Sequence, residues 1–299
     1  MEEIGAMIGK GFDVWRSNLN LCIPFLLSIF VSMLIFVPFL AAIFATTLPT
    51  ESMNATLFLQ NIEDMQKLQD QMQGYLGSLA MDRILQIAVL FLMLILLLSL
   101  VNAFFTAGAI GMAREALETG TSHTGAMWSA GKKYFLNMFL ATLLMGLITI
   151  AGLIFLLPAL MQGTTSLQAD AQAMGLLAVG LLMFILYVLV MSVILVTTPY
   201  ALVVKELGPV QAVLASINFF RYNKFDVVVL WLVVAALSLG MQMISGVFST
   251  GGGTEVQPLS AITGVVNLLV LAPLSNLWWT RLYMNRKGML KVNEVKDQW

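Results

Sequence analysis

Cysteine and histidine are each present only once in the 299 residues, as Cys22 and His123. A single thiol excludes an internal disulfide and a thiolate metal cluster. A single imidazole in the polar stretch 121–125 lacks the partners that a metal site or a general base needs. The sequence also lacks a Gly-rich phosphate loop and a nucleophile elbow. It therefore predicts a protein that is not an enzyme and that uses no metal and no other cofactor.

Charge is also scarce. Only 10% of the residues are charged, 59% are hydrophobic, and the mean hydropathy is +0.90. This composition lies outside the range of soluble globular domains and is typical of an integral membrane protein. We expect membrane lipids as partners and no nucleic acid.

Long apolar runs account for this composition. Each run can cross a hydrocarbon core of roughly 30 Å at about 1.5 Å per helical residue. Six such runs are present, at about 21–47, 84–109, 138–161, 174–198, 225–248 and 259–280. The sequence thus predicts six transmembrane helices within a single membrane domain that covers residues 1–299.

The distribution of basic residues predicts the orientation of these helices. Of the fifteen Lys and Arg residues, only Lys67 and Arg83 lie in loops on one side, and the other thirteen lie on the opposite side or in the terminal segments. The positive-inside rule therefore places both termini in the cytoplasm, and we expect a multi-pass protein of the plasma membrane. The acidic start at Glu2 and Glu3 predicts that the first run is a true span and not a cleaved signal peptide.

A motif recurs before the first, third and fifth runs, where an aromatic residue precedes an asparagine by three positions. The pairs are Trp15 with Asn18, Tyr134 with Asn137, and Phe220 with Asn223. The ring suits the headgroup level, and the asparagine can cap free N–H groups where a spanning helix begins. One interpretation is a threefold repeat of membrane-entry elbows. The alternative is that any entry site on the inner leaflet favours such a pair.

The expected fold is therefore an all-α, polytopic membrane helical bundle of three hairpins. Short cytoplasmic interfacial helices enter and leave the hairpins, which span about 10–112, 126–208 and 212–285. An apolar stripe at helical spacing predicts an outer amphipathic helix at about 56–80, which lies on the bilayer, caps the bundle or binds a partner. Residues 286–299 form a basic cytoplasmic tail.

Polar groups within the six runs are few. Asp226 is the only Asp, Glu, His, Lys or Arg within them, and it lies at the start of the fifth run. Asn102, Asn267 and Asn276 are mid-membrane amides, which more often join helices than bind a substrate. We expect them to make interhelical polar contacts.

Charged residues at the inner ends of the even spans form the candidate functional surface. The residues are Arg114, Glu115, Lys205, Glu206 and Arg281. If they converge, they form a patch for lipid phosphate or for an acidic partner segment. The alternative is that each side chain extends independently to its own headgroup.

The elbows and the segment 199–213 resemble a group of uncharacterised six-span prokaryotic membrane domains that are abundant in archaea. The shared features are a proline that ends an even span, a basic-acidic pair before a glycine, and an amphipathic helix leading to an aromatic residue and Asn223. These domains are similar to the membrane domain of some glycerophosphoryl diester phosphodiesterases. The resemblance implies a fold but no activity, because the soluble catalytic domain has no counterpart here.

Two functions remain open. The first is a non-enzymatic scaffold or accessory protein that binds a protein partner or lipid through its cytoplasmic helices or its outer helix. The alternative is a transport protein such as the permease subunit of an ATP-driven exporter, which resembles this chain in its six spans and inward termini. Such a permease needs no charge in mid-span, because an ATPase supplies the energy.

Overall fold

The computed structural model describes residues 2–47, 81–163, 171–249 and 263–290, and every regular element in these ranges is helical. The segments η1 and η2 are 3-10 helices, and η4 is a π-helix. In chain order the elements are α1 (Ile4–Ser17), η1 (Leu19–Cys22), α2 (Ile23–Thr47), α5 (Met81–Thr119), α6 (Thr124–Ala151), η2 (Gly152–Leu156), α7 (Leu157–Gly163), α8 (Ala171–Leu195), α9 (Thr198–Lys205), α10 (Pro209–Tyr222), α11 (Lys224–Ser249), η4 (Asn267–Leu271) and α13 (Ala272–Arg286).

Five helical stretches are long and apolar enough to cross a membrane. They are Leu19–Ile43, Ile84–Thr119, Thr124–Ala159, Met174–Lys205 and Lys224–Met243. Their side chains remain largely exposed within the protein, as they would be if lipid surrounded them. These five stretches correspond to the first five predicted spans and indicate a membrane protein.

The sixth predicted span, 259–280, is described only from residue 263, where a helix runs through η4 into α13. The predicted outer helix at 56–80 and most of the basic tail, from residue 291 onward, lie outside the described residues. The six-span count therefore remains a prediction.

The chain divides into two compact units. One contains Ser28–Asn102, and the other contains Met1–Leu27 together with Ala103–Trp299. In the smaller unit, α2 from Ser28 onward and the first half of α5 carry almost only apolar side chains, and Pro38 lies inside α2. The larger unit contains all five residues of the predicted charged patch.

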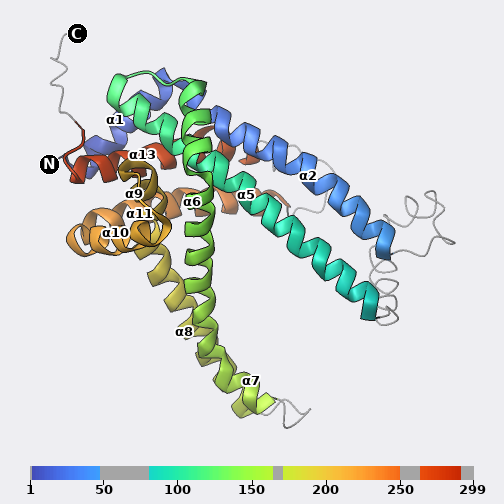
Figure 1. The fold of residues 1–299 in the computed structure, drawn as a ribbon. Helices are drawn as coiled ribbons and strands as arrows, with labels where there is room; N and C mark the ends of the chain where they lie inside the picture. Colours follow the sequence, from blue (N-terminus) through green and yellow to red (C-terminus); the bar gives the residue numbers. More distant parts are fainter. Residues whose placement is uncertain (1, 48–80, 164–170, 250–262, 291–299) are drawn as a thin grey trace. The chain divides into compact units, whose positions relative to one another are not determined.

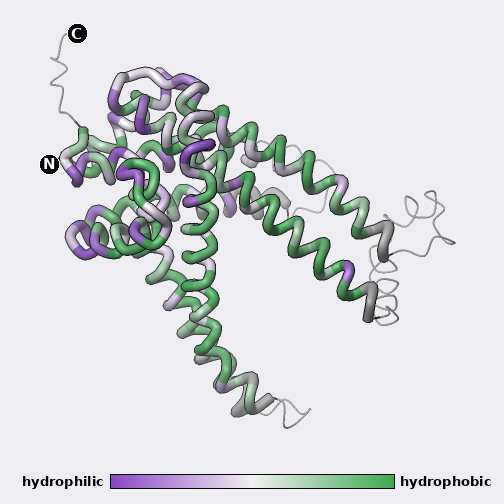
Figure 2. The backbone as a smooth tube through the Cα atoms, in the orientation of Figure 1, coloured by the Kyte–Doolittle hydropathy of each residue, from purple (hydrophilic) through white to green (hydrophobic). Residues whose placement is uncertain are grey.

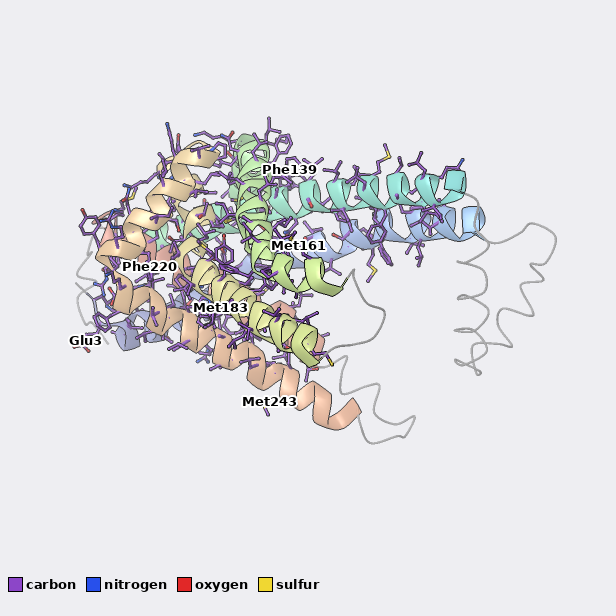
Figure 3. The ribbon with its side chains drawn as sticks, turned by 90° about the horizontal axis from the view of Figure 1, so that it is seen from below. Glu3, Phe139, Met161, Met183, Phe220 and Met243 are labelled. Carbon is purple, nitrogen blue, oxygen red and sulfur yellow. The ribbon has the colours of Figure 1, made fainter. Side chains whose placement is uncertain are left out.

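Within the larger unit, four shorter helices pack together into a head, which we define as α1, α9, α10 and α13 with the adjoining ends of α5 and α6. Figure 1 shows α6 and α8 extending from the head. In Figure 2 hydrophilic residues concentrate in the head, whereas α8 is hydrophobic along its length. Figure 3 shows α8 and α11 side by side, with Met183 on α8 and Met243 towards the far end of α11.

The core of the larger unit lies in the head. Met7 of α1, Leu202 of α9, Phe219 of α10 and Tyr283 of α13 are completely or almost completely buried. The end of α5 approaches α6 closely because Gly111 has no side chain, since a Cβ at this position would overlap Ala130. Small residues commonly allow membrane helices to approach in this way.

Interruptions in the long helices are matched by side chains from neighbouring elements. The Tyr187 hydroxyl donates to the Ile148 carbonyl, where α6 passes into η2. The Ser216 hydroxyl donates to the Ile194 carbonyl at the end of α8. Each of these carbonyls lies where a helix changes or ends, so a side chain from a neighbouring element supplies its hydrogen-bond donor.

The structure corrects part of the predicted hairpin pattern. Separate helices occur before the first and fifth spans, as α1 and α10, and after the fourth, as α9. The short helix predicted before the third span is wrong, because α6 continues from Thr124 to Ala151. The segment after the second span is likewise the end of α5, which continues to Thr119. Neither junction contains a proline, and Gly120, at φ +84°, ends α5.

Candidate functional site: the charged head

Aromatic packing holds the head together around α13. The rings of Phe219 and Tyr283 lie with centroids 5.0 Å apart, and Tyr200 stacks on Trp279 at 6.4 Å. The indole N–H of Trp278 donates to the Ile8 carbonyl of α1 at 3.1 Å. The first helix of the chain is thus docked on the last described helix.

Glu2 links α1 and α13 through ion pairs with a side chain of each helix. Its carboxylate accepts two hydrogen bonds from the Arg281 guanidinium, each 3.1 Å long, and one from the Asn285 amide at 3.3 Å. Lys10 forms a further ion pair with it at 2.8 Å. Burial raises the pKa of Glu2, but the hydrogen bonds from Arg281 and Lys10 outweigh burial and hold the pKa below its ordinary value. We call this set the Glu2 clasp.

A second ion pair joins α13 to the start of α11. The Arg286 Nε donates to Asp226 at 2.6 Å, and its Nη2 donates to the Glu2 carbonyl at 3.2 Å. Only 8% of the Arg286 side chain is exposed. Its Nη1 has no hydrogen-bond partner among the described residues. A buried charge that lost its partner would be costly, so this pair fixes the entrance of α11 against α13.

A third ion pair lies at the end of α9. Glu206 adopts a left-handed conformation, at φ 55°, and ends the helix. Its carboxylate pairs with Lys133 of α6 at 2.8 Å, and this hydrogen bond is the largest cause of its lowered pKa. Lys133 also lies over the Tyr134 ring, 5.0 Å from the centroid. The Lys133–Glu206 pair therefore ties α6 to α9.

Lys205 and Lys287 lie close enough for their charges to interact, and neither forms an ion pair with a described residue. Desolvation lowers the pKa of Lys287 most, and repulsion from Lys205 lowers it further. The Lys287 ammonium lies 5.7 Å from the centroid of the Phe219 ring. Positive charge is therefore concentrated between the ends of α9 and α13.

The structure assigns a partner to most residues of the predicted patch. Arg114 pairs with Glu118 at 2.8 Å, and Glu115 accepts a hydrogen bond of 2.9 Å from the His123 backbone. Arg281 belongs to the Glu2 clasp and Glu206 to the Lys133 pair. The field of Arg114 also reaches Glu206 and lowers its pKa. Two of the five residues, Arg281 and Glu206, are used in ion pairs between elements, and the patch as a binding site remains a prediction.

The three predicted elbows have different structures. Asn18 joins two loops: its amide donates to the carbonyls of Val14 and Gly120 at 3.0 Å, and its Oδ1 accepts from the Ser122 N–H at 3.0 Å. Asn223 follows the last residue of α10, and its amide donates to the Phe219 carbonyl. Asn137 lies inside α6. None of the three caps a free N–H at the start of a helix, so the predicted capping role is wrong.

The aromatic partners of these asparagines also differ. The rings of Trp15 and Phe12 lie 5.5 Å apart, and the Trp15 indole nitrogen is buried without a hydrogen-bond partner among the described residues. Tyr134 is buried beneath Lys133. Phe220 is only partly buried, and Figure 3 labels it on the head.

The three predicted interhelical amides differ in exposure. Asn102 and Asn267 are exposed, and Asn276 is partly buried. The backbone carbonyl of Asn276 accepts a hydrogen bond from the Thr280 hydroxyl within α13. Their role in joining helices remains a prediction.

Sequence reasoning missed the two residues that organise the head, Glu2 and Arg286. The side chains that contact Glu2 on α13 are 279 and 283 positions away, and Arg286 is 60 positions from Asp226. The only available signal was Asp226, an isolated carboxylate at the entrance of an apolar run, which needs a cationic partner. The described residues contain no cluster of three or more metal-ligating side chains.

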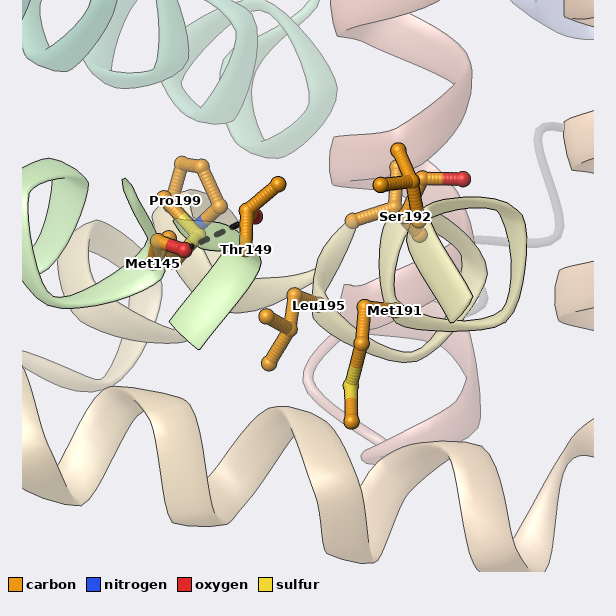
Figure 4. A pocket seen from close by; sticks show the side chains of 8 residues that line it. Met145, Thr149, Met191, Ser192, Leu195 and Pro199 are labelled. Carbon is orange, nitrogen blue, oxygen red and sulfur yellow. Dashed lines mark hydrogen bonds between the residues drawn. The ribbon is translucent and has the colours of Figure 1, made fainter. Parts of the chain in front are cut away.

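An apolar groove of about 260 Å³ lies between α6 and α8. Its only hydroxyl side chains, Thr149 and Ser192, donate to the carbonyls of Met145 and Leu189 in their own helices. Figure 4 shows Met145, Thr149, Met191, Leu195 and Pro199 around it. The groove offers apolar surface but no free polar group to orient a ligand.

The described residues form an all-helical structure with five helical stretches of membrane-spanning length. A family model for a domain of unknown function (DUF7847) matches residues 28–276. The chain belongs to this family, which agrees with the expected uncharacterised family.

A search of curated proteins found a similar chain, named an uncharacterized protein, from Archaeoglobus fulgidus. It is 24% identical over 293 residues, which cover 95% of this chain and 96% of the relative. No solved structure matches the chain. These comparisons support membership of an uncharacterised family and add no activity.

Proposed function

We propose that the protein is a non-enzymatic scaffold or accessory protein of the plasma membrane, which holds a partner protein or organises lipid through the charged head. The observation that carries this proposal is the construction of the head. Ion pairs and buried aromatic rings fix its four shorter helices, while Lys205 and Lys287, which pair with no described carboxylate, remain at its surface. A rigid surface with such positive charge suits anionic lipid or an acidic segment of a partner.

In the proposed topology six helices cross the membrane as three hairpins, and the head and both termini lie in the cytoplasm. The thirteen basic residues assigned to that side support this orientation. The resemblance to the membrane domain of glycerophosphoryl diester phosphodiesterases is compatible with this topology.

A detergent pull-down of the full chain, with identification of co-purified proteins and lipids, tests the scaffold. We expect a reproducible partner or a selected lipid that is reduced when both Lys205 and Lys287 are changed to Gln. The matched control is Arg16→Gln with Lys132→Gln, which removes two exposed charges away from Lys205 and Lys287. We call the surface around Lys205 and Lys287 the α9–α13 surface. Equal retention by both variants would contradict a role for the α9–α13 surface.

The orientation has its own test. A cysteine introduced at the exposed residue Thr121, after changing Cys22 to Ser, should be protected from an impermeant thiol reagent in intact cells. It should react once the membrane is permeabilised. Labelling in intact cells would place the head outside and would contradict the proposed topology.

The alternative is a transport protein such as the permease subunit of an ATP-driven exporter. The interrupted helices favour it, because transporters bind substrates where spanning helices are broken. The described breaks are η2, the α8–α9 junction and η4. A co-purified nucleotide-binding subunit and ATP-dependent uptake into inverted vesicles would support transport. Their absence, together with partner capture, would favour the scaffold.

A further inference from the structure

The corner between α10 and α11 exposes two aromatic rings. Tyr222 is 85% exposed and Phe225 is 88% exposed, which makes them the most exposed large apolar side chains among the described residues. They flank Asn223, where α10 ends and α11 begins. Isolated exposed apolar residues are common on proteins, but two nearly bare rings beside a spanning helix point to a lipid contact.

The backbone of the corner is held in place, so the exposure of the rings is built into the fold. The Asn223 N–H and its side-chain amide both donate to the Phe219 carbonyl, at 3.0 and 3.1 Å. The Val227 N–H donates to the Asn223 carbonyl at 3.1 Å. Phe219 and Val227 are completely buried and anchor the two helices on either side of the turn.

The corner also carries unpaired positive charge. Arg221 and Lys224 are exposed, and neither forms an ion pair with a described residue. The only carboxylate in this stretch, Asp226, is neutralised by Arg286 at 2.6 Å. The two free cations therefore attract an anion without competition from the nearest acidic side chain.

The outer face of α10 continues the apolar surface towards its first turn. Val210 and Leu214 are both more than half exposed. At about 100° per residue they lie on the same face of the helix as Arg221. The opposite face, with Ala212, Val213, Ser216 and Phe219, is buried in the head.

We propose that residues 221–225 form a binding corner for the headgroup of an anionic phospholipid. Arg221 and Lys224 bind the lipid phosphate, while Tyr222 and Phe225 insert among the headgroups and the first methylenes. The occupant is a lipid because α11 is of spanning length and its first turn contains Phe225, which places the corner where the chain enters the bilayer. This inference names one lipid contact and rests on the proposed function only in treating the chain as a membrane protein.

The test measures which lipid the full chain retains. The protein in detergent is mixed with equal amounts of phosphatidylglycerol and phosphatidylcholine, and native mass spectrometry counts the bound lipids. Arg221→Gln with Lys224→Gln should lower the preference for phosphatidylglycerol by about fivefold for each charge removed. The control, Arg16→Gln with Lys132→Gln, removes two exposed charges elsewhere and should leave the preference unchanged.

A second variant tests the rings separately from the charges. Tyr222→Ser with Phe225→Ser should reduce the amount of both lipids retained while the preference for phosphatidylglycerol persists. All substituted side chains are exposed, so each variant should remain monodisperse in gel filtration. An equal loss of preference in the charge variant and its control, or full lipid retention by the ring variant, would overturn the lipid corner.

The pull-down distinguishes a failure of this inference from a failure of the scaffold. If the charge variant loses a protein partner but keeps its lipid preference, the corner is a protein contact and the lipid assignment is wrong. If the lipid preference falls as expected and no partner is captured, the corner stands and only the scaffold proposal fails.

Discussion

The thiol of Cys22 donates a hydrogen bond to the backbone carbonyl of Leu269, and the two atoms lie 3.0 Å apart. Leu269 lies in the π-helix η4, four residues before Pro273. Pro273 has no N–H, so it cannot donate the α-helical hydrogen bond to this carbonyl. The single cysteine therefore supplies a donor at an irregular stretch of an apolar helix.

This relationship predicts that Cys22→Ala destabilises the protein by about 1–3 kcal/mol, the cost of a buried carbonyl without a partner. Cys22→Ser keeps a donor and should cost less. Thermal unfolding in detergent measures the difference. In a Pro273→Ala background, where an N–H is restored, the cost of Cys22→Ala should largely disappear. An unchanged cost in that background would show that the thiol acts through packing alone.

Two glycines of α1 should respond oppositely to alanine. A Cβ at Gly11 would lie 2.5 Å from Trp278 Cδ1, so Gly11→Ala should displace the indole and cost about 1–3 kcal/mol. Gly9 has nothing within 4 Å of the same position. Gly9→Ala should therefore be neutral or stabilise by roughly 0.5–1 kcal/mol through helix propensity. Similar unfolding temperatures for the two variants would contradict the docking of α1 on α13.

The Glu2 clasp predicts a dependence of stability on pH. The pKa of Glu2 is lowered in the folded state from its ordinary value of 4.5. The clasp therefore contributes its full stabilisation above this ordinary value and loses it as the pH falls through the folded pKa. Glu2→Gln should cost about 1–3 kcal/mol at pH 7 and progressively less in acid.

Unfolding temperatures between pH 7 and pH 3 provide the measurement. Glu3→Gln changes an exposed neighbouring carboxylate and serves as the control. A constant difference between the wild type and Glu2→Gln across this range would mean that the charge of Glu2 is not what stabilises the head.

The three asparagines of the predicted elbows should not be equivalent. Asn18→Ala removes two hydrogen bonds of 3.0 Å to the 120–122 turn and one of 3.0 Å to the Val14 carbonyl of α1, and should cost about 1–3 kcal/mol. Asn137→Ala, inside α6, should be nearly neutral, and Asn223→Ala should fall between them. Equal losses at all three positions in a denaturation series would instead support a threefold repeat.

The sequence was sufficient to predict an all-helical membrane protein and the position of its first five spans. Apolar runs determine spans because each residue contributes to the cost of leaving lipid, whatever its neighbours in space. Gly120 and the 206–209 stretch end α5 and α9 through local backbone chemistry.

Tertiary structure decided which charges meet between helices. Glu206 was recognised as a charged residue at a helix end, but its partner Lys133 depended on the approach of α6 to α9. Arg114 instead pairs with Glu118 one helical turn later, which is a local contact within α5. Glu2 and Arg286 are separated by almost the whole chain. Burial gives these charges their importance, because in a poorly solvated head each one must find a partner.

Residues 221–225 likewise combine a feature that the sequence predicted with one that only the packing of helices decided. The sequence placed an aromatic residue and an asparagine at the entrance of the fifth span, but it could not tell which ring faces outward. The packing of Phe219 in the core leaves Phe220 partly buried and turns Tyr222 and Phe225 outward. Hydropathy along the chain determined where each spanning helix begins. The contacts between helices decided which side chains remain exposed at that boundary, because burial depends on neighbours that are distant in sequence.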